Sequence, residues 1–161
     1  MIASAFVENG IRTYITSRKA EQCLATAERL SELGECIALP ADLSTRDGRD
    51  TFVAEIRSRE SRLDILVNNA GAAWGATFED YPESGYDKVM NINVKAVFML
   101  TRDLLPLLRN GASMEKPARV INIGSIDGLR VSSTDNFAYG ASKAAVHFLT
   151  RNLAVRLGPE G

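Results

Sequence analysis

A tyrosine and a lysine stand four positions apart in the stretch FAYGASKAA, as Tyr139 and Lys143. Residues i and i+4 of a helix share a face, so the ammonium group can lie near the phenol. A free phenol titrates near pH ~10, which makes it a poor proton donor and acceptor at neutral pH. A cation at about 4 Å favours the phenolate by about 4 kcal/mol when the effective dielectric constant is about 20, and the positive end of the helix adds to this. The pair therefore predicts a tyrosine that acts as general acid and base.

Other stretches give this pair a context. The Tyr-x-x-x-Lys spacing is common, and alone it indicates no more than a solvated helix face. NIGSIDG places Ser125 just after an apolar run, 14 positions before Tyr139. ILVNNAGAAWG places residues 68–71 after another apolar run, and MNINVKAVF places Asn93 inside a predicted helix, where an amide is a mediocre helix former.

The elements that must position these residues alternate between strands and helices. Strand patterns lie at 11–16, 35–40, 63–68 and 118–123. Helical patterns lie at 1–9, with Gly10 as the expected stop, at 19–33, after Ser44, which is expected to cap that helix, at 83–109 and at 138–157. The helix at 83–109 is expected to break near Asn91 and to bend at Pro106. Alternating strands and helices predict an α/β fold with right-handed crossovers and a doubly wound parallel sheet. Ligands of such sheets bind at the carboxyl ends of the strands, where Ser125 and residues 68–71 lie.

The composition predicts one ordinary globular domain over residues 1–161 and excludes several classes of protein. A formal net charge of -1 and a pI near 5.9 give no footprint for nucleic acid or an anionic membrane. No apolar stretch approaches the ~20 residues of a membrane-spanning helix. Cys23 and Cys36 have no metal-ligand spacing, so we expect reduced thiols, no metal site and a cytoplasmic location.

The four chemical features together resemble the classical type of the short-chain dehydrogenase/reductase family. That family has Asn-Asn-Ala-Gly after its fourth strand, a Ser after its fifth, Tyr-x-x-x-Lys in the next helix and an Asn in the helix between. The resemblance covers essentially the whole chain and implies a Rossmann-like fold. WGATFEDYPESGYDKVMNINVKAVF and PARVINIGS are similar to its 3-oxoacyl-thioester reductase branch, which includes reductases linked to rhamnolipid synthesis.

The resemblance implies catalytic roles for four residues. Tyr139 would protonate a substrate carbonyl oxygen while a hydride arrives from the nicotinamide, and the reverse reaction would oxidise a secondary alcohol. Lys143 would make the phenol more acidic and bind the nicotinamide ribose. Ser125 would hold the carbonyl oxygen, and Asn93 would anchor a water that relays protons to Lys143. The alternatives are a turn residue at Ser125 and a simple helix interruption at Asn93.

The resemblance also implies cofactor contacts. Asp42 and Leu43 would contact the adenine, although a helix-start role explains Asp42 almost as well. Asn69, Ala70 and Gly71 would line the adenosine ribose, with the glycine allowing close backbone approach.

The end of the strand at 11–16 bears on the choice of cofactor. The acidic residue that would bind a ribose 2'-hydroxyl is absent there, and Ser17 and Arg18 stand in its place. A guanidinium pairs with a 2'-phosphate through charge-assisted hydrogen bonds, so we expect NADP(H) rather than NAD(H). The alternative is that Arg18 is only a solvated charge at a helix start.

Three features leave two interpretations each. Trp74 either lines the substrate pocket or anchors its loop, and His147, the single histidine, is more typical of a packed or surface residue than of a functional one. The helical stretches at 94–108 and 144–157 are apolar on more than one side. The resemblance explains this by a homodimer or homotetramer, and a thick core explains it equally well.

Both ends of the sequence depart from the family pattern. The pattern has a strand and a Thr-Gly-x-x-x-Gly-x-Gly turn before the helix at 1–9, and a strand and substrate loop after residue 161. The sequence therefore predicts an incomplete sheet, and a fragment that binds NADP(H) poorly and reduces little by itself. A non-catalytic chain that acts only through oligomerisation remains an alternative. A serine hydrolase built on Ser125 and His147 is disfavoured, because GSIDG is not Gly-x-Ser-x-Gly.

Overall fold

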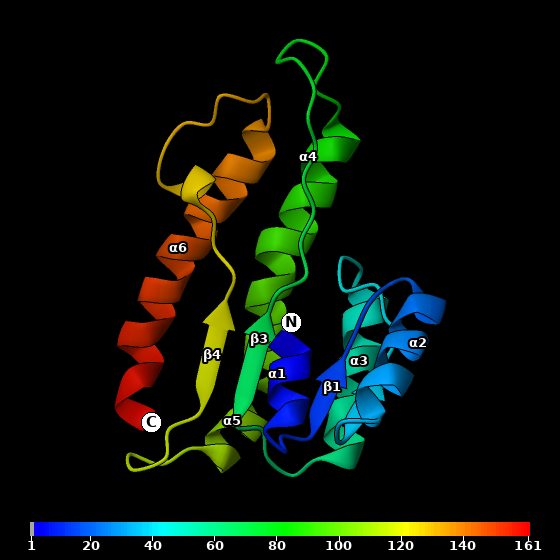
Figure 1. The fold of residues 1–161 in the computed structure, drawn as a ribbon. Coiled ribbons are helices and arrows are strands. Elements are labelled where there is room, and N and C mark those ends of the chain that lie inside the picture. Colours follow the sequence, from blue (N-terminus) through cyan, green and yellow to red (C-terminus); the bar gives the residue numbers. More distant parts are fainter. Residues whose placement is uncertain (1) are drawn as a thin grey trace. The chain divides into compact units, whose positions relative to one another are not determined.

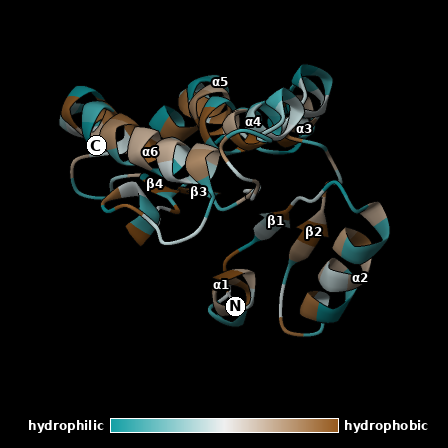
Figure 2. Ribbon diagram, turned by 90° about the horizontal axis from the view of Figure 1, so that it is seen from above, coloured by the Kyte–Doolittle hydropathy of each residue, from teal (hydrophilic) through white to brown (hydrophobic). Residues whose placement is uncertain are grey.

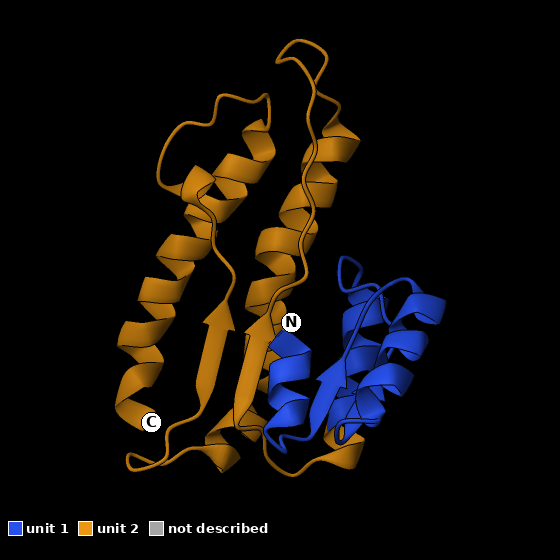
Figure 3. Ribbon diagram, in the orientation of Figure 1, with its two compact units in different colours: residues 1–56 blue, residues 57–161 orange. Residues whose placement is uncertain are grey.

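The computed structural model describes residues 2–161, which form two compact units divided after Ile56 (Figure 3). Each unit contains a two-stranded parallel sheet, so the described strands pair two by two. The α/β class and the parallel pairing predicted from the sequence are confirmed. The incomplete sheet that we expected is present as two separate ladders.

The first unit begins with two helices and two short strands. They are α1 (Ile2–Glu8), β1 (Thr13–Ile15), α2 (Ala20–Ser31) and β2 (Cys36–Ala38) (Figure 1). Their bounds agree with the predicted elements within a few residues, and Met1 lies outside the described residues. The strand β1 pairs in parallel with β2, with Thr13 beside Cys36 and Ile15 beside Ala38. One cluster of buried residues in this unit contains Val7, Ala27, Leu30 and Cys36.

A glycine ends α1 as the sequence predicts. Gly10 has a φ of 73°, in the left-handed region that favours glycine. Its N–H donates to the carbonyl of Val7 at 2.9 Å, and the N–H of Ile11 donates to that of Phe6 at 3.0 Å. This pair of bonds is a Schellman motif, which satisfies the last carbonyls of the helix and turns the chain toward β1.

The helix α3 (Arg46–Arg59) begins one residue later than the capping role of Ser44 requires. The hydroxyl of Thr45 accepts the N–H of Gly48 at 3.1 Å, so Thr45 caps the helix. Ser44 instead donates its N–H and its hydroxyl to the carboxylate of Asp42, at 3.0 and 2.6 Å. The predicted cap was therefore wrong, because Asp42 binds the Ser44 hydroxyl.

The second unit contains the other two described strands and three α-helices. They are β3 (Ile65–Asn68), α4 (Glu83–Met90), α5 (Ala96–Gly111), β4 (Arg119–Asn122) and α6 (Phe137–Leu157). The strands β3 and β4 pair in parallel, with Asn68 beside Asn122. Figure 2 shows α5 and α6 on the same side of this pair. The helices hold most of this unit's buried apolar residues, among them Val97, Leu104 and Val146.

The helix predicted at 83–109 is interrupted where we expected. A π-helical turn, Asn91–Lys95, joins α4 to α5, whereas α5 continues through Pro106. Short 3-10 helices occupy Ile126–Gly128 and Gly158–Glu160. A π turn inserts an extra residue into a helix and often marks a functional position. Here it carries Asn93.

Candidate active site

The predicted site residues form two groups, one in each unit. Ser17, Arg18, Asp42 and Leu43 belong to the first unit, whereas Asn69–Gly71, Asn93, Ser125, Tyr139 and Lys143 belong to the second. In both units these residues follow the carboxyl ends of strands or lie on elements packed against those ends.

Lys143 and Tyr139 lie on the same face of α6. The ammonium nitrogen of Lys143 is 5.6 Å from the centroid of the Tyr139 ring. It donates a 2.6 Å hydrogen bond to the carbonyl of Ile123, the residue that follows β4. The lysine is only 7% exposed, and burial lowers its pKa from the ordinary value. The structure thus places a buried cation beside a half-buried phenol.

Ser125 begins a short turn after β4. Its hydroxyl oxygen accepts the N–H of Asp127 at 3.2 Å, which makes it the cap of the 3-10 helix. The Asp127 carboxylate in turn accepts from the side chain of Asn136 at 3.0 Å, just before α6. The turn-residue alternative for Ser125 is therefore observed. A hydroxyl that accepts one bond keeps its hydrogen for another partner, so substrate binding is compatible with this geometry.

Asn93 is 1% exposed and holds the loop after β3. Its side chain accepts the N–H of Ala72 and donates to the carbonyl of the same residue, both at 2.9 Å. Its second amide hydrogen goes to the hydroxyl of Ser142 at 2.9 Å. Both amide hydrogens are therefore bound to protein atoms. The side chain clamps the loop after β3 to α6, so the predicted water would need another group to hold it.

Ser142 is a member of the site that the sequence analysis missed. It is fully buried, and its hydroxyl donates to the carbonyl of Tyr139 at 2.7 Å while accepting from Asn93. A small polar residue three positions after the tyrosine was the available signal. Its spacing did not reveal its partner, because Asn93 lies 49 positions away.

The first unit brings Arg18 and Asp42 together. The ladder continues beyond the strands, with the N–H of Ala41 donating to the carbonyl of Ser17 at 3.2 Å. The hydrogen bond from Ser44 is the main cause of the lowered pKa of Asp42, and the charge of Arg18 lowers that pKa further. Arg18 itself is exposed.

A buried arginine supports the Asp42–Leu43 segment. Arg49 is 5% exposed and donates to the carbonyl of Leu43 at 2.9 Å. Leu43 is itself buried, which leaves its side chain without access to a ligand at the surface. The sequence analysis missed Arg49, because an arginine within a helix is normally a solvated residue.

Trp74 anchors its loop. A side chain at Gly85 would come within 2.9 Å of the indole ring, so the ring lies directly on α4. The ammonium of Lys88 lies 5.0 Å from the ring centroid, and the hydroxyl of Tyr81 donates to the carbonyl of Trp74 at 3.1 Å. Of the two interpretations of this tryptophan, the structure favours the anchor.

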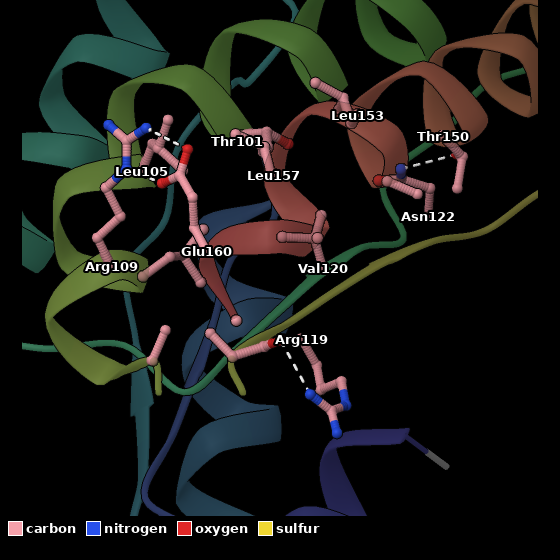
Figure 4. A pocket seen from close by; sticks show the side chains of 16 residues that line it. Thr101, Leu105, Arg109, Arg119, Val120, Asn122, Thr150, Leu153, Leu157 and Glu160 are labelled. Atoms are coloured by element: carbon pink, nitrogen blue, oxygen red, sulfur yellow. Dashed lines mark hydrogen bonds and ion pairs between the residues drawn. The ribbon is translucent and has the colours of Figure 1, made fainter. Parts of the chain in front are cut away.

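A cavity of about 270 Å³ lies away from these residues. Figure 4 shows it between α5, α6 and the beginning of β4, with Leu105, Val120 and Leu153 among its lining residues. The ion pair between Arg109 and Glu160, with a shortest distance of 2.5 Å, lies along its lining. Because Ser125 follows the opposite end of β4, this cavity is not part of the candidate active site.

Residues 2–161 contain no cluster of metal-ligating side chains and no helix able to span a membrane. No group of three or more His, Cys, Asp or Glu side chains in this part of the chain could hold a metal ion. None of the helices in the same range has the length and apolar character needed to cross a bilayer. Cys23 and Cys36 are buried, free thiols.

Comparisons with known proteins identify similar chains. A rhamnolipids biosynthesis 3-oxoacyl-(acyl-carrier-protein) reductase from Pseudomonas aeruginosa is 52% identical over 157 residues, which are 98% of this chain and 61% of that protein. The structure of a Pseudomonas aeruginosa RhlG/NADP active-site complex matches with a TM-score of 0.94 and 52% identity, over 99% of this chain and 62% of that one. A metagenomic short-chain oxidoreductase in complex with NADP matches with a TM-score of 0.88 and 29% identity, over 99% of this chain and 71% of that one.

The chain therefore spans about 61% of the length of the Pseudomonas reductase. A family profile described as short chain dehydrogenase matches residues 1–161, which is the whole sequence. The resemblance inferred from the Asn-Asn-Ala-Gly, Ser and Tyr-x-x-x-Lys motifs is confirmed by this match. The chain belongs to the short chain dehydrogenase family.

Proposed function

We propose that this protein is an NADP(H)-dependent oxidoreductase that interconverts a carbonyl compound and a secondary alcohol. The observation that carries the proposal is the arrangement on α6. A buried lysine ammonium lies beside the Tyr139 ring and is bound to Ile123, two residues before Ser125. A phenol, a cation and a hydroxyl on adjoining segments are the groups that carbonyl reduction requires.

The residues of this chain would handle the proton and orient the substrate. Ser125 would donate its hydroxyl hydrogen to the substrate oxygen, and Tyr139 would deliver the proton to that oxygen. Lys143 would stabilise the phenolate that remains. When bound, the nicotinamide cofactor supplies the hydride. Asn93 and Ser142 would hold the beginning of α6 in place through the Tyr139 carbonyl.

The exposed groups at the strand ends fit NADP(H). Asn69, Ala70 and Gly71 are exposed, so their backbone is open to a ligand. Gly71 lies against Asn93, where a side chain would come within 3.2 Å of the amide oxygen. Arg18 is exposed at the end of β1 and can pair with a 2'-phosphate. The relatives with bound NADP support the same cofactor.

An apolar rim, defined as Ile126, Leu129 and Val131, supports a 3-oxoacyl substrate. These side chains directly follow Ser125 and are 55%, 69% and 96% exposed. A carbonyl held by Ser125 would place an attached acyl chain on this rim, where burial contributes about 0.8 kcal/mol per methylene. The name of the Pseudomonas reductase supports the same class, a 3-oxoacyl group carried on a thioester.

The test is NADPH oxidation with 3-oxoacyl pantetheine thioesters of four to twelve carbons. The sequence predicts weak NADPH binding and slow turnover for residues 1–161 alone. We expect that turnover to rise with chain length and to fall at least 100-fold in Tyr139→Phe, because general acid catalysis contributes about 100-fold or more. Arg18→Ala should reduce the preference for NADPH over NADH, with Lys19→Ala as the neighbouring control. Absence of both NADPH binding and reduction would overturn the proposal.

A second candidate is a chain that acts only by associating with copies of itself. Phe98 on α5 and Phe148 on α6 are 42% and 63% exposed, which favours a homodimer or homotetramer built on these helices. Light scattering on the unaltered chain and on Phe148→Asp measures whether the chain associates through this face. NADPH binding and oxidation then distinguish an associating chain from a reductase. An associating chain that neither binds nor oxidises NADPH would support this second candidate.

A further inference from the structure

The segment Ile123–Gly128, here named the serine turn, lies directly on the first turns of α6. Lys143 binds the carbonyl of Ile123, as described above. A side chain at Gly128 would come within 2.6 Å of the backbone carbonyl carbon of Lys143, so the two backbones touch. At Gly140 a side chain would lie 3.2 Å from the carbonyl of Asp127. The position of Ser125 is therefore set by what α6 presents beneath it.

His147 lies under the first part of this turn. It is four residues after Lys143 and eight after Tyr139, so the three side chains form one stripe along α6. A side chain built at Gly124 would collide with the Nε2 atom of His147 and would come within 2.9 Å of its Cδ2 atom. Contacts this short mean that the imidazole ring occupies the space beside Gly124, the residue before Ser125.

The other ring nitrogen of His147, Nδ1, forms no hydrogen bond with the described residues. Within the described residues, Nδ1 of His147 is buried and has no hydrogen-bond partner. A buried polar atom without a partner costs stability, and such atoms call for an explanation. An apolar side chain of similar size would avoid that cost. The contact with Gly124 therefore accounts for the position of the ring better than hydrogen bonding through Nδ1 does.

We propose that His147 is a positioning residue that fixes Gly124 and thereby the hydroxyl of Ser125. Lys143 holds the carbonyl before Gly124, and the His147 ring holds Gly124 itself. The backbone is then fixed on both sides of the peptide that leads into the serine. This inference rests on the proposed function for its catalytic consequence, while its structural part stands independently.

A double-mutant cycle tests the contact. We expect Gly124→Ala to lower the free energy of unfolding and His147→Ala to recover much of that loss in the double variant, since the ring no longer meets the methyl group. Gly158→Ala is the matched control, because nothing lies within 4 Å of a side chain at that glycine. Equal costs of Gly124→Ala with and without His147 would overturn the contact.

Two conservative variants test the positioning. Gln extends as far as Nε2, whereas Asn does not. Loss of the aromatic ring moves nearby amide proton resonances in both variants, so the readout is the 13Cα resonance of Ser125, which reports the backbone conformation. We expect this resonance to stay in place in His147→Gln and to shift in His147→Asn. Unchanged resonances in both variants would overturn the proposal even if the chain reduces no ketone, so this readout is separate from the proposed function.

The proposed positioning of Ser125 by His147 also predicts a change in kcat. A displacement of about 1 Å can cost roughly 100-fold in rate, so we expect His147→Asn to lower kcat at least tenfold with an unchanged NADPH Kd. In a Ser125→Ala background the same substitution should have no further effect on kcat. A full additional loss in that background would show that His147 does not act through Ser125.

Discussion

At the scale of single residues, burial and charge explain most of the site. Lys143 is buried by the serine turn and is held by a neutral carbonyl. Asp42, in contrast, receives two hydrogen bonds from Ser44 and lies near the charge of Arg18, so its pKa falls. Burial therefore destabilises the charged form of Lys143, whereas the hydrogen bonds from Ser44 and the charge of Arg18 stabilise the charged form of Asp42.

The lowered pKa of Lys143 predicts a stability change at alkaline pH. Between its lowered pKa in the folded chain and the ordinary value of 10.5, the unfolded chain holds a proton that the folded chain has lost. The contribution of Lys143 to the free energy of unfolding therefore rises with pH through that window and is constant on either side. Lys143→Met should remove this rise in urea unfolding measured at successive pH values.

Lys116→Met is the matched control, because the Lys116 side chain is 79% exposed. This substitution should leave the slope of the unfolding free energy against pH unchanged. If Lys143→Met leaves that slope unchanged as well, burial of the Lys143 ammonium does not contribute to the pH dependence of stability.

At the scale of elements, repeating apolar patterns were enough to predict the strands and helices. The helix predicted at 138–157 is Phe137–Leu157, and the strand predicted at 63–68 is Ile65–Asn68. The strand at 11–16 is shorter, Thr13–Ile15, because a strand extends only as far as its partner pairs with it. Local patterns identify an element, whereas its ends depend on a neighbour that the pattern does not specify.

The same limit explains what the sequence analysis missed in the site. The interruption at Asn91–Lys95 was predicted from an amide in a helix, but its clamp on Ala72 spans 21 positions. Ser142 and Arg49 looked like ordinary helix residues. Both are buried because of distant partners or packing that no spacing rule contains.

The Asn93 clamp predicts a stability loss that involves two elements. Asn93→Ala leaves the N–H and carbonyl of Ala72 without their partner and removes the bond that the Ser142 hydroxyl accepts, which should cost about 2–4 kcal/mol of unfolding free energy. The amide of Ala72 should also exchange faster with solvent. Urea unfolding and hydrogen exchange measure the two effects.

Asn91 offers a control for this substitution, because it lies in the same π-helical turn and is half-buried. We expect Asn91→Ala to cost much less than Asn93→Ala. Equal costs would mean that the turn itself, and not the clamp, carries the stability.

At the scale of the whole molecule, the two units differ in what holds their sheets together. The ladder of the second unit has a buried polar network, in which Asn68 donates to Asn122 at 2.8 Å and to Thr101 at 3.2 Å. Asn122 donates in turn to Thr150 at 2.9 Å, which ties β4 to α6. The first unit, in contrast, has strands of only three residues.

This difference predicts unequal protection of the two ladders. Because β1 and β2 are three residues long, whereas β3 and β4 are four residues long and carry the polar network, the amides of β1 and β2 should open at a lower free energy than those of β3 and β4. Native-state hydrogen exchange at increasing denaturant measures both sets in one sample. If the sets merge into a single opening at all concentrations, the chain behaves as the single domain that the sequence predicts. If β1 and β2 exchange first, the two units are separate cooperative units, and their stabilities can be altered independently.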